Sequence, residues 1–78
     1  MNTPPSRSII AAEVRAAMGR ADINQSELAA LIDMSKASLS ERLACKRPFS
    51  TDHLDAIGKA LGVDPLSLML PAWNGDAA

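Results

Sequence analysis

Residues 25–43 read QSELAALIDMSKASLSERL and contain two short amphipathic segments, separated by a break that is too short to be a loop. In the first segment, apolar side chains at i, i+3 and i+4 make one side of a helix apolar; they are Leu28, Ala29, Leu31 and Ile32. Asn24 precedes this segment, and Glu27 three residues later completes the pattern of a capping box. The first segment is therefore expected to be a helix that begins directly after Asn24.

The break at residues 33–35 reads Asp-Met-Ser. Asp is a poor interior helix residue that tolerates turn geometry, and Ser35 can cap the helix that follows. In that second segment, residues 36–43, only Leu39 and Leu43 are large and apolar. A helix with so narrow a buried seam can lie against another molecule along its remaining faces, which is typical of a recognition helix.

The two segments and the turn between them resemble the helix-turn-helix of the lambda-repressor/Cro-like family, whose members are also called XRE-type domains. The resemblance extends from about Val14 to Met69, which is most of the chain. It implies an all-α fold: a compact bundle of about five short helices, in which helices 2 and 3 form the helix-turn-helix motif.

The resemblance also gives places to individual residues. Gln25 would open the first helix of the motif, and Ala29 would be the small residue at the helix crossing. Asp33 would stand at the turn position that is usually Gly. Met34 and Leu39 would be the two apolar residues beneath the recognition helix.

The chain departs from the family's pattern around the end of the recognition helix. Many members carry Arg at the position of Met18 and Glu at that of Leu43, which form an ion pair. Here both residues are apolar, so we expect a packing contact instead. Arg42 stands where an apolar residue is commoner, which predicts a rotated or distorted last turn. Cys45 stands where Gly often follows the helix, which predicts a different exit or some backbone strain.

The 78 residues are enough for one domain with a single core. A chain of this length buries only about 60% of its unfolded surface, so helix packing must supply most of the stability. We expect residues 1–7 to form a flexible N-terminal arm and residues 8–71 to form the helix-turn-helix DNA-binding domain. Residues 72–78 are expected to form a C-terminal tail.

Three further helices are expected outside the motif. The first is capped by Ser8 and extends to about Ala21, with Asp22 in the left-handed conformation that ends it. The second is capped by Ser50 and ends at Gly62. The third is the last helix of the bundle.

This last helix is expected to begin at Pro65, a residue well suited to the first helical position, and to stop at Pro71. The residues that would close the bundle from this helix are Leu66, Met69 and Leu70.

The net charge of −1 is low for a DNA-binding domain, which is usually basic. Residues 36–47 nevertheless carry a local charge of +3, and the remainder of the chain carries −4. The charged residues of that segment are Lys36, Arg42, Lys46 and Arg47 against Glu41 alone. The positive charge is thus concentrated on and just after the proposed recognition helix, where phosphates would lie.

Several classes of function have no support in the sequence. A single cysteine excludes an internal disulfide, and one cysteine with one histidine leaves no set of metal ligands. No apolar run is long enough to cross a membrane, and the N-terminus lacks a secretory signal, so a soluble cytoplasmic protein is expected. Without a catalytic pair or a Gly-rich phosphate loop, we expect no enzymatic activity, no cofactor and no small-molecule substrate.

If the recognition helix at residues 36–43 lies in the major groove of double-stranded DNA, its N-terminal residues face the base edges. Lys36 suits guanine, Ala37 suits a thymine methyl group, and Glu41 suits cytosine N4, while Ser40 can bond in either sense. The phosphate contacts expected around them come from Gln25, Ser35, Ser38, Arg42, Lys46 and Arg47.

The expected function is a sequence-specific transcriptional regulator, in particular a repressor that binds a two-fold operator as a homodimer. A phage immunity repressor, a Cro-like protein and a host XRE-type regulator all fit the sequence. Trp73 either contributes a dimer contact or folds back on Leu66 and Leu70. The alternative, from another class, is a protein-interaction module on a helix-turn-helix scaffold, such as an antitoxin.

Overall fold

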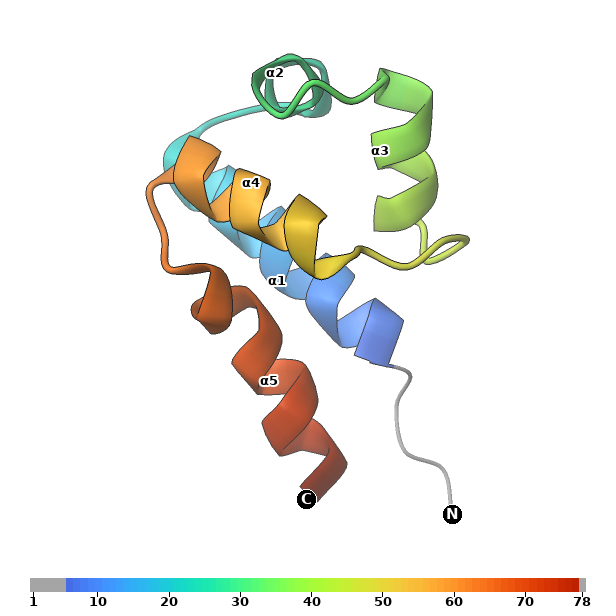
Figure 1. Cartoon of the computed structure of the whole chain (residues 1–78), viewed down its shortest axis with the longest axis vertical. Coiled ribbons are helices and arrows are strands. Elements are labelled where there is room, and N and C mark those ends of the chain that lie inside the picture. The colour runs from blue at the N-terminus through green and yellow to red at the C-terminus, as the bar shows by residue number, and fades with distance from the viewer. Residues whose placement is uncertain (1–5, 78) are drawn as a thin grey trace.

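The computed structural model of the chain describes the backbone of residues 6–77 and the side chains of residues 7–71. Within these residues it contains five helices and no strand, which confirms the expected all-α fold (Figure 1). The helices are α1 (Ser6–Ala21), α2 (Gln25–Leu31), α3 (Lys36–Leu43), α4 (Thr51–Leu61) and α5 (Pro65–Ala77). As predicted, the second and third helices form the helix-turn-helix.

Helix α1 is the scaffold of the bundle. It packs against α3, α4 and α5, while α2 packs against α3 and α4. The motif formed by α2 and α3 lies at one end of the molecule, and α5 lies at the other end beside α1 (Figure 1). Every helix contributes to a single core cluster, whose buried residues are Val14, Ala17, Met18, Leu28, Ala29, Leu39, Leu43, Leu54, Ile57 and Leu68.

Local hydrogen bonds fix the starts of α2 and α3. The Glu27 backbone N–H donates to Asn24 Oδ1 at 2.8 Å, and the Asn24 N–H donates to Glu27 Oε1 at 3.0 Å. The Ser38 N–H donates to the Ser35 hydroxyl at 3.0 Å. These bonds satisfy backbone donors that have no partner within their own helices. The predicted capping box and the predicted Ser35 cap are confirmed.

Left-handed backbone conformations occur at the three positions where the sequence called for a turn or a helix end. Asp22 follows α1 with a φ of 57°, Asp33 lies between α2 and α3 with a φ of 57°, and Gly62 follows α4 with a φ of 73°. Asp tolerates this region because its short polar side chain can bond locally. The bundle therefore places its turns as predicted.

Helix α1 begins two residues earlier than expected. It starts at Ser6, so Ser6 and Arg7 belong to the helix and Ser8 lies inside it rather than capping it. No residue after Pro5 resists helical geometry, so the helix can extend up to that proline. The remainder of the predicted N-terminal arm, residues 1–5, lies outside the described residues.

The prediction that Pro71 stops the last helix is wrong. Helix α5 continues to Ala77 with Pro71 inside it, so the predicted tail is helical through residue 77. A proline removes one N–H donor and crowds the preceding turn, at a cost of about 3 kcal/mol. Its fixed φ is itself helical, however, so the chain can continue as a helix beyond it.

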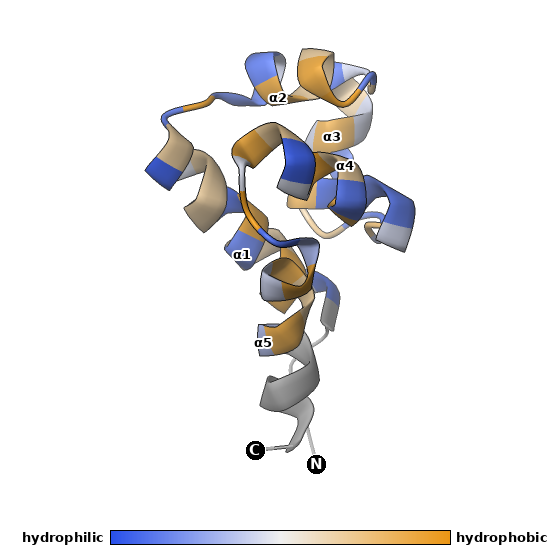
Figure 2. Cartoon of the chain, turned by 60° about the vertical axis from the view of Figure 1, so that its left-hand side comes forward, coloured by the Kyte–Doolittle hydropathy of each residue, from blue (hydrophilic) through white to orange (hydrophobic). Residues whose placement is uncertain are grey.

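The face that α5 turns toward the core also differs from the prediction. Leu68 is buried with 1% of its surface exposed, whereas Leu66 is 56% exposed and Leu70 is 49% exposed. Met69 is partly buried against the core, as expected. The beginning of α5 is apolar on nearly every side, so spacing alone does not select one face (Figure 2). Packing against α1 and α4 makes that selection.

Candidate nucleic-acid interface

Helix α3 has a narrow buried side and a broad outward side. Only Leu39, with 0% exposure, and Leu43, with 4%, are buried on this helix. The four residues predicted to contact bases are all exposed, and their spacing places them on one face of the helix. They are Lys36, Ala37, Ser40 and Glu41.

The turn before α3 holds the two helices of the motif at a fixed relation. The Met34 N–H donates to the Ala29 carbonyl at 2.9 Å, directly after Asp33 has turned the chain. Met34 packs against the core beneath α3, and Ala29 is 3% exposed at the helix crossing. The positions that the family resemblance assigned to Ala29, Asp33 and Met34 therefore agree with the structure.

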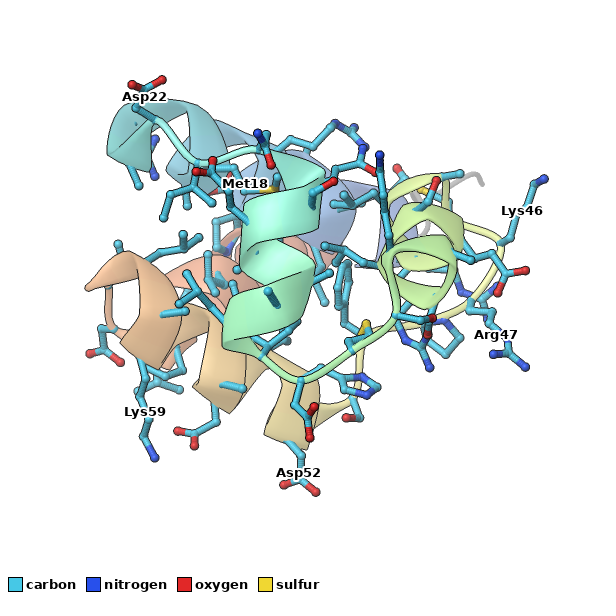
Figure 3. All side chains as sticks on the ribbon, turned by 90° about the horizontal axis from the view of Figure 1, so that it is seen from above. Met18, Asp22, Lys46, Arg47, Asp52 and Lys59 are labelled. Carbon is cyan, nitrogen blue, oxygen red and sulfur yellow. The ribbon has the colours of Figure 1, made fainter. Side chains whose placement is uncertain are left out.

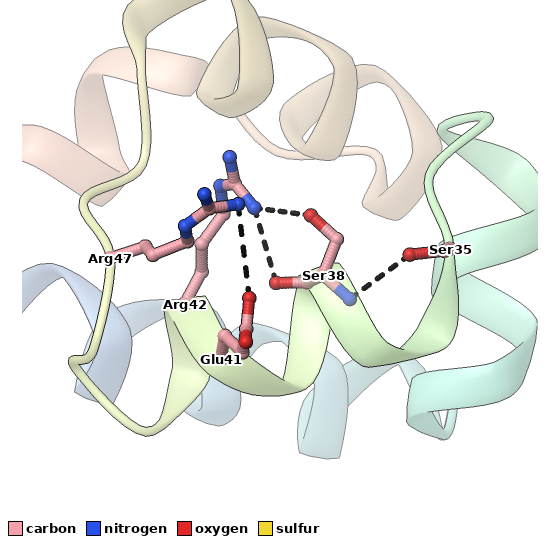
Figure 4. Close-up of polar contacts among 5 residues, drawn as sticks. All are labelled: Ser35, Ser38, Glu41, Arg42 and Arg47. Atoms are coloured by element: carbon pink, nitrogen blue, oxygen red, sulfur yellow. Dashed lines mark hydrogen bonds and ion pairs between the residues drawn. The ribbon is translucent and has the colours of Figure 1, made fainter.

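Arg42 is folded along its own helix in the structure. Its Nη1 donates to the Ser38 carbonyl at 3.2 Å and also to the Ser38 hydroxyl, one turn earlier (Figure 4). Its Nε is buried and has no hydrogen-bond partner among the described residues. Helix α3 continues through Arg42 to Leu43, so the predicted distortion of its last turn does not occur. The two predicted phosphate contacts Ser38 and Arg42 are thus bonded to each other.

The basic loop after α3 is only partly free of acidic neighbours. Arg47 Nη1 lies 3.8 Å from Glu41 Oε1 (Figure 4). The Arg47 side chain is 59% exposed and the Glu41 side chain is 50% exposed. An exposed ion pair at this distance contributes little stability and exchanges readily with solvent or another ligand. Lys46 is exposed and extends away from the bundle beyond α3 (Figure 3). Among the described side chains, the loop therefore presents one cation without an ion pair and one weakly paired cation.

The chain leaves α3 through a residue in the left-handed conformation, at the position where Gly is common in the family. Cys45 has a φ of 67°. Its N–H donates to the Arg42 carbonyl at 3.1 Å, and the Lys46 N–H donates to the Glu41 carbonyl at 2.9 Å. This pair of bonds is a Schellman motif, which usually has Gly at the left-handed position. The chain thus leaves α3 as a Gly-containing member would, with a Cys in the unfavourable conformation.

His53 completes the capping box of α4, a role that sequence reasoning missed. Its Nδ1 accepts a hydrogen bond from the Ser50 N–H at 3.0 Å, and its own N–H donates to the Ser50 hydroxyl at 3.1 Å. Partial burial, and then the nearby Arg42 guanidinium, lower the pKa of His53 below its usual 6.5, while Asp52 partly offsets them. The ring is therefore held neutral at the start of α4.

The remaining predicted site residues lie before α3 or outside the described side chains. Gln25 is half-buried at the start of α2, and Ser35 is exposed as the cap of α3. Met18 and Leu43, the apolar replacements for the family's ion pair, are both buried in the core cluster. The side chain of Trp73 lies outside the described residues, so the proposed dimer contact of Trp73 stays a prediction.

Two negative findings concern the described residues. No helix among them is long and apolar enough to cross a membrane. No group of three or more His, Cys, Asp or Glu side chains within residues 7–71 could hold a metal ion.

Comparison with solved structures shows where the fold recurs. Two crystal structures of the clp gene regulator ClgR from Corynebacterium glutamicum match, each with 24% sequence identity. One has a TM-score of 0.86 and covers 97% of this chain and 81% of that chain. The other has a TM-score of 0.82 and covers 91% of this chain and 92% of that chain. At this identity the likeness establishes the fold.

No curated protein matches the sequence. A family model does match, however, and it spans residues 13–69, which include all of α2, α3 and α4 and the second half of α1. Its description is the Cro/C1-type HTH DNA-binding domain. With more than half of the chain matched, and with the capped helices, tight turn and exposed third helix in place, the chain belongs to the Cro/C1-type HTH DNA-binding domain family.

Proposed function

We propose that this chain is a sequence-specific double-stranded DNA-binding transcriptional regulator whose helix α3 lies in the major groove. The observation that carries the proposal is the outward side of α3, where Lys36, Ala37, Ser40 and Glu41 are exposed while Leu39 and Leu43 hold the helix to the core. The first residues of such a helix reach the base edges. The shared fold of the gene regulator ClgR supports a regulatory role.

The phosphate contacts in this proposal surround α3. Lys46 and Arg47 come from the loop after α3, Ser35 from its cap, and Gln25 from the start of α2. Ser38 and Arg42 are already bonded to each other, so each must exchange that bond to contact a phosphate. Lys46 and Arg47 are therefore the main source of charge-dependent affinity.

We further propose that the chain acts as a repressor and binds a two-fold operator as a homodimer. Leu66 and Leu70 lie one turn apart on α5 and are about half exposed, which suits a contact between two copies. A closed two-fold dimer would place two copies of α3 against half-sites about one helical turn of DNA apart. A phage repressor, a Cro-like protein and a host regulator share these features.

A protein-interaction module, such as an antitoxin, is the second candidate. One observation favours it: three large apolar side chains are exposed on a chain with a net charge of −1. They are Leu31, Leu66 and Leu70. A chain of this class would bind a protein through these residues and would show no preference among DNA sequences.

Two substitutions test the assignment of α3 and its loop. Lys36→Ala should relax the sequence preference, because a base contact of this kind contributes about 1–3 kcal/mol of discrimination. Arg47→Ala should weaken binding to all sequences and reduce the slope of log affinity against log salt by about one. Both quantities come from titrations of labelled duplexes at several salt concentrations.

Lys59→Ala is the matched control. Lys59 is an exposed cation on α4 that pairs with Asp55 at 3.0 Å, and it lies on a different part of the surface from Lys46 and Arg47 (Figure 3). Its loss should leave both the sequence preference and the salt slope unchanged. If Lys36→Ala and Arg47→Ala behave like Lys59→Ala, the proposed placement of α3 in the groove is wrong.

A further inference from the structure

The last turn of α3 has carbonyl groups that find no N–H donor within the regular helix pattern. Two of them, those of Glu41 and Arg42, accept backbone N–H groups of the exit turn. That of Leu43 accepts a hydrogen bond from the side chain of Arg15 on α1 at 2.6 Å. The two backbone bonds are Cys45 N–H to Arg42 and Lys46 N–H to Glu41, which follow the last regular helix bond from Ala44 N–H to Ser40. Arg15 therefore completes the C-terminal end of the helix.

The charge of Arg15 suits this position. The C-terminal end of a helix carries partial negative charge, so a cation there is stabilising. Arg15 has no ion pair with an acidic side chain among the described residues, so its Nη1 bond to Leu43 is its one polar contact there. A guanidinium also presents several donors in a planar group, which favours a directed bond to a carbonyl.

Arg15 and Met18 lie one turn apart on α1. Met18 is buried in the core cluster with the Leu43 side chain, while Arg15 bonds the Leu43 carbonyl. With eight residues, α3 is too short to be stable alone, so its direction depends on such contacts. Its N-terminal end is fixed by Ser35, and its C-terminal end is fixed from α1.

We infer that Arg15 is a positioning residue for DNA recognition. Its bond to Leu43 sets the angle of α3 against α1, and thereby the angle at which Lys36 and Ser40 meet the base edges. Arg15 acts through α3 and does not itself touch DNA. This inference rests on the proposed function, because it assigns Arg15 a role in the same interface.

The first experiment compares duplex binding by Arg15→Ala, Arg15→Lys and Arg20→Ala. Arg20 is an exposed cation on the same helix with no hydrogen bond or ion pair among residues 7–71, so it controls for lost charge. The DNA is a duplex selected from random sequences by the unsubstituted chain. Arg15→Ala should bind it about tenfold more weakly and distinguish it less well from a scrambled duplex. Its salt slope should equal that of the unsubstituted chain, because no phosphate contact is lost.

Arg15→Lys keeps a cationic donor and should recover most of the affinity and of the discrimination. If Arg15→Ala does not fold, Arg15→Lys takes its place in the comparison. Arg15→Lys should then show a smaller loss of discrimination, again with an unchanged salt slope. A salt slope reduced by about one, with equal weakening for all sequences, would show a phosphate contact and overturn the inference. Binding by Arg15→Ala equal to that by Arg20→Ala would overturn it as well.

The second experiment needs no DNA and separates this inference from the proposed function. Amide hydrogen exchange is measured on the free chain at Ala44, Cys45 and Lys46, whose N–H groups bond to the last turn of α3. Arg15→Ala should speed their exchange several-fold relative to Arg20→Ala, because the turn opens locally more often. Equal exchange rates in the two variants would contradict the claim that the Arg15 bond to Leu43 stabilises this turn. If exchange is faster in Arg15→Ala but the unsubstituted chain does not bind DNA, the role of Arg15 at the end of α3 stands and the proposed function is refuted.

Discussion

His53 accepts a hydrogen bond from the Ser50 N–H through Nδ1, and only the neutral ring can accept it. Protonation would remove this bond and place a positive charge at the start of α4, where the helix dipole is also positive. The Arg42 guanidinium of α3 adds to the unfavourable field, and Asp52 reduces it. Protonation of His53 is therefore unfavourable in the folded chain.

The free energy of unfolding should decrease as the pH falls from about 7.5 to about 5.5. The pKa of His53 is lowered in the folded chain, so below 6.5 the unfolded state binds the proton more readily than the folded state does. The contribution of His53 to stability is fully present above 6.5 and is lost as the pH decreases from there through the lower pKa of the folded chain. Urea denaturation at several pH values measures this dependence.

His53→Gln provides the control for this pH dependence. Gln at the third helical position can still accept the Ser50 N–H and complete a capping box, but it does not titrate. Because His53 is the single histidine of the sequence, the variant should lose most of the change in stability between these pH values. An equal pH dependence in both chains would mean that another group is responsible.

At the scale of the helix, Gly58 allows the end of α4 and the start of α5 to lie close together. A Cβ atom at this position would lie 2.8 Å from the Val63 carbonyl oxygen and 2.8 Å from Pro65 Cγ. Neither neighbour is the end of a flexible side chain. A residue larger than Gly at position 58 therefore requires one of these neighbours to shift.

Gly58→Ala should lower the free energy of unfolding by about 1–2 kcal/mol, because overpacking outweighs the gain of about 1 kcal/mol in helix propensity. Gly19→Ala is the matched control, since Gly19 is also helical and nothing lies within 4 Å of its Cβ position. That substitution should raise the stability by about 0.5–1 kcal/mol. Opposite signs in thermal or urea unfolding support the close contact, and equal signs argue against it.

The starts of α2, α3 and α4 and the end of α4 could be predicted from the sequence because their causes are local. Asn24, Ser35 and Ser50 each bond a backbone group three residues away, and Gly62 needs only its own conformational freedom. The course of α5 could not be predicted in this way. Whether a helix continues past Pro71 depends on packing along its whole length, which no neighbouring residue encodes.

In the candidate site, too, features with local causes could be predicted from the sequence and those that depend on distant residues could not. Helical spacing was enough to place Lys36, Ala37, Ser40 and Glu41 outward, because the buried seam of α3 is narrow. The i, i+4 spacing of Ser38 and Arg42 was a usable signal for their bond that sequence reasoning passed over. The Arg15 bond to Leu43 joins residues 28 positions apart, and no local pattern announces it.

At the scale of the whole molecule, the exposed leucines of α5 bear on self-association. Replacing Leu66 and Leu70 by Ser should shift sedimentation equilibrium toward the monomer, because the apolar contact between copies is lost. The stability of the monomer should change little, since both side chains are about half exposed. Binding to a two-fold duplex should weaken more than binding to a single half-site.

Leu31→Ser is the control for association. Leu31 is 59% exposed on α2, so it matches the other two leucines in size and exposure but lies on a different helix. It should leave the association constant unchanged. If Leu31→Ser and not the α5 double variant prevents association, the contact between copies lies on α2 instead.

The most direct test of the account is selection from a pool of random duplexes at low salt, repeated at two higher salt concentrations. A dimeric regulator that reads bases through α3 predicts one enriched inverted repeat, with half-sites about one helical turn apart, bound with a steep negative salt slope. Enrichment of a single half-site would support base reading by α3 but contradict the dimer. No enrichment at any salt concentration would contradict the central claim that this chain recognises a DNA sequence.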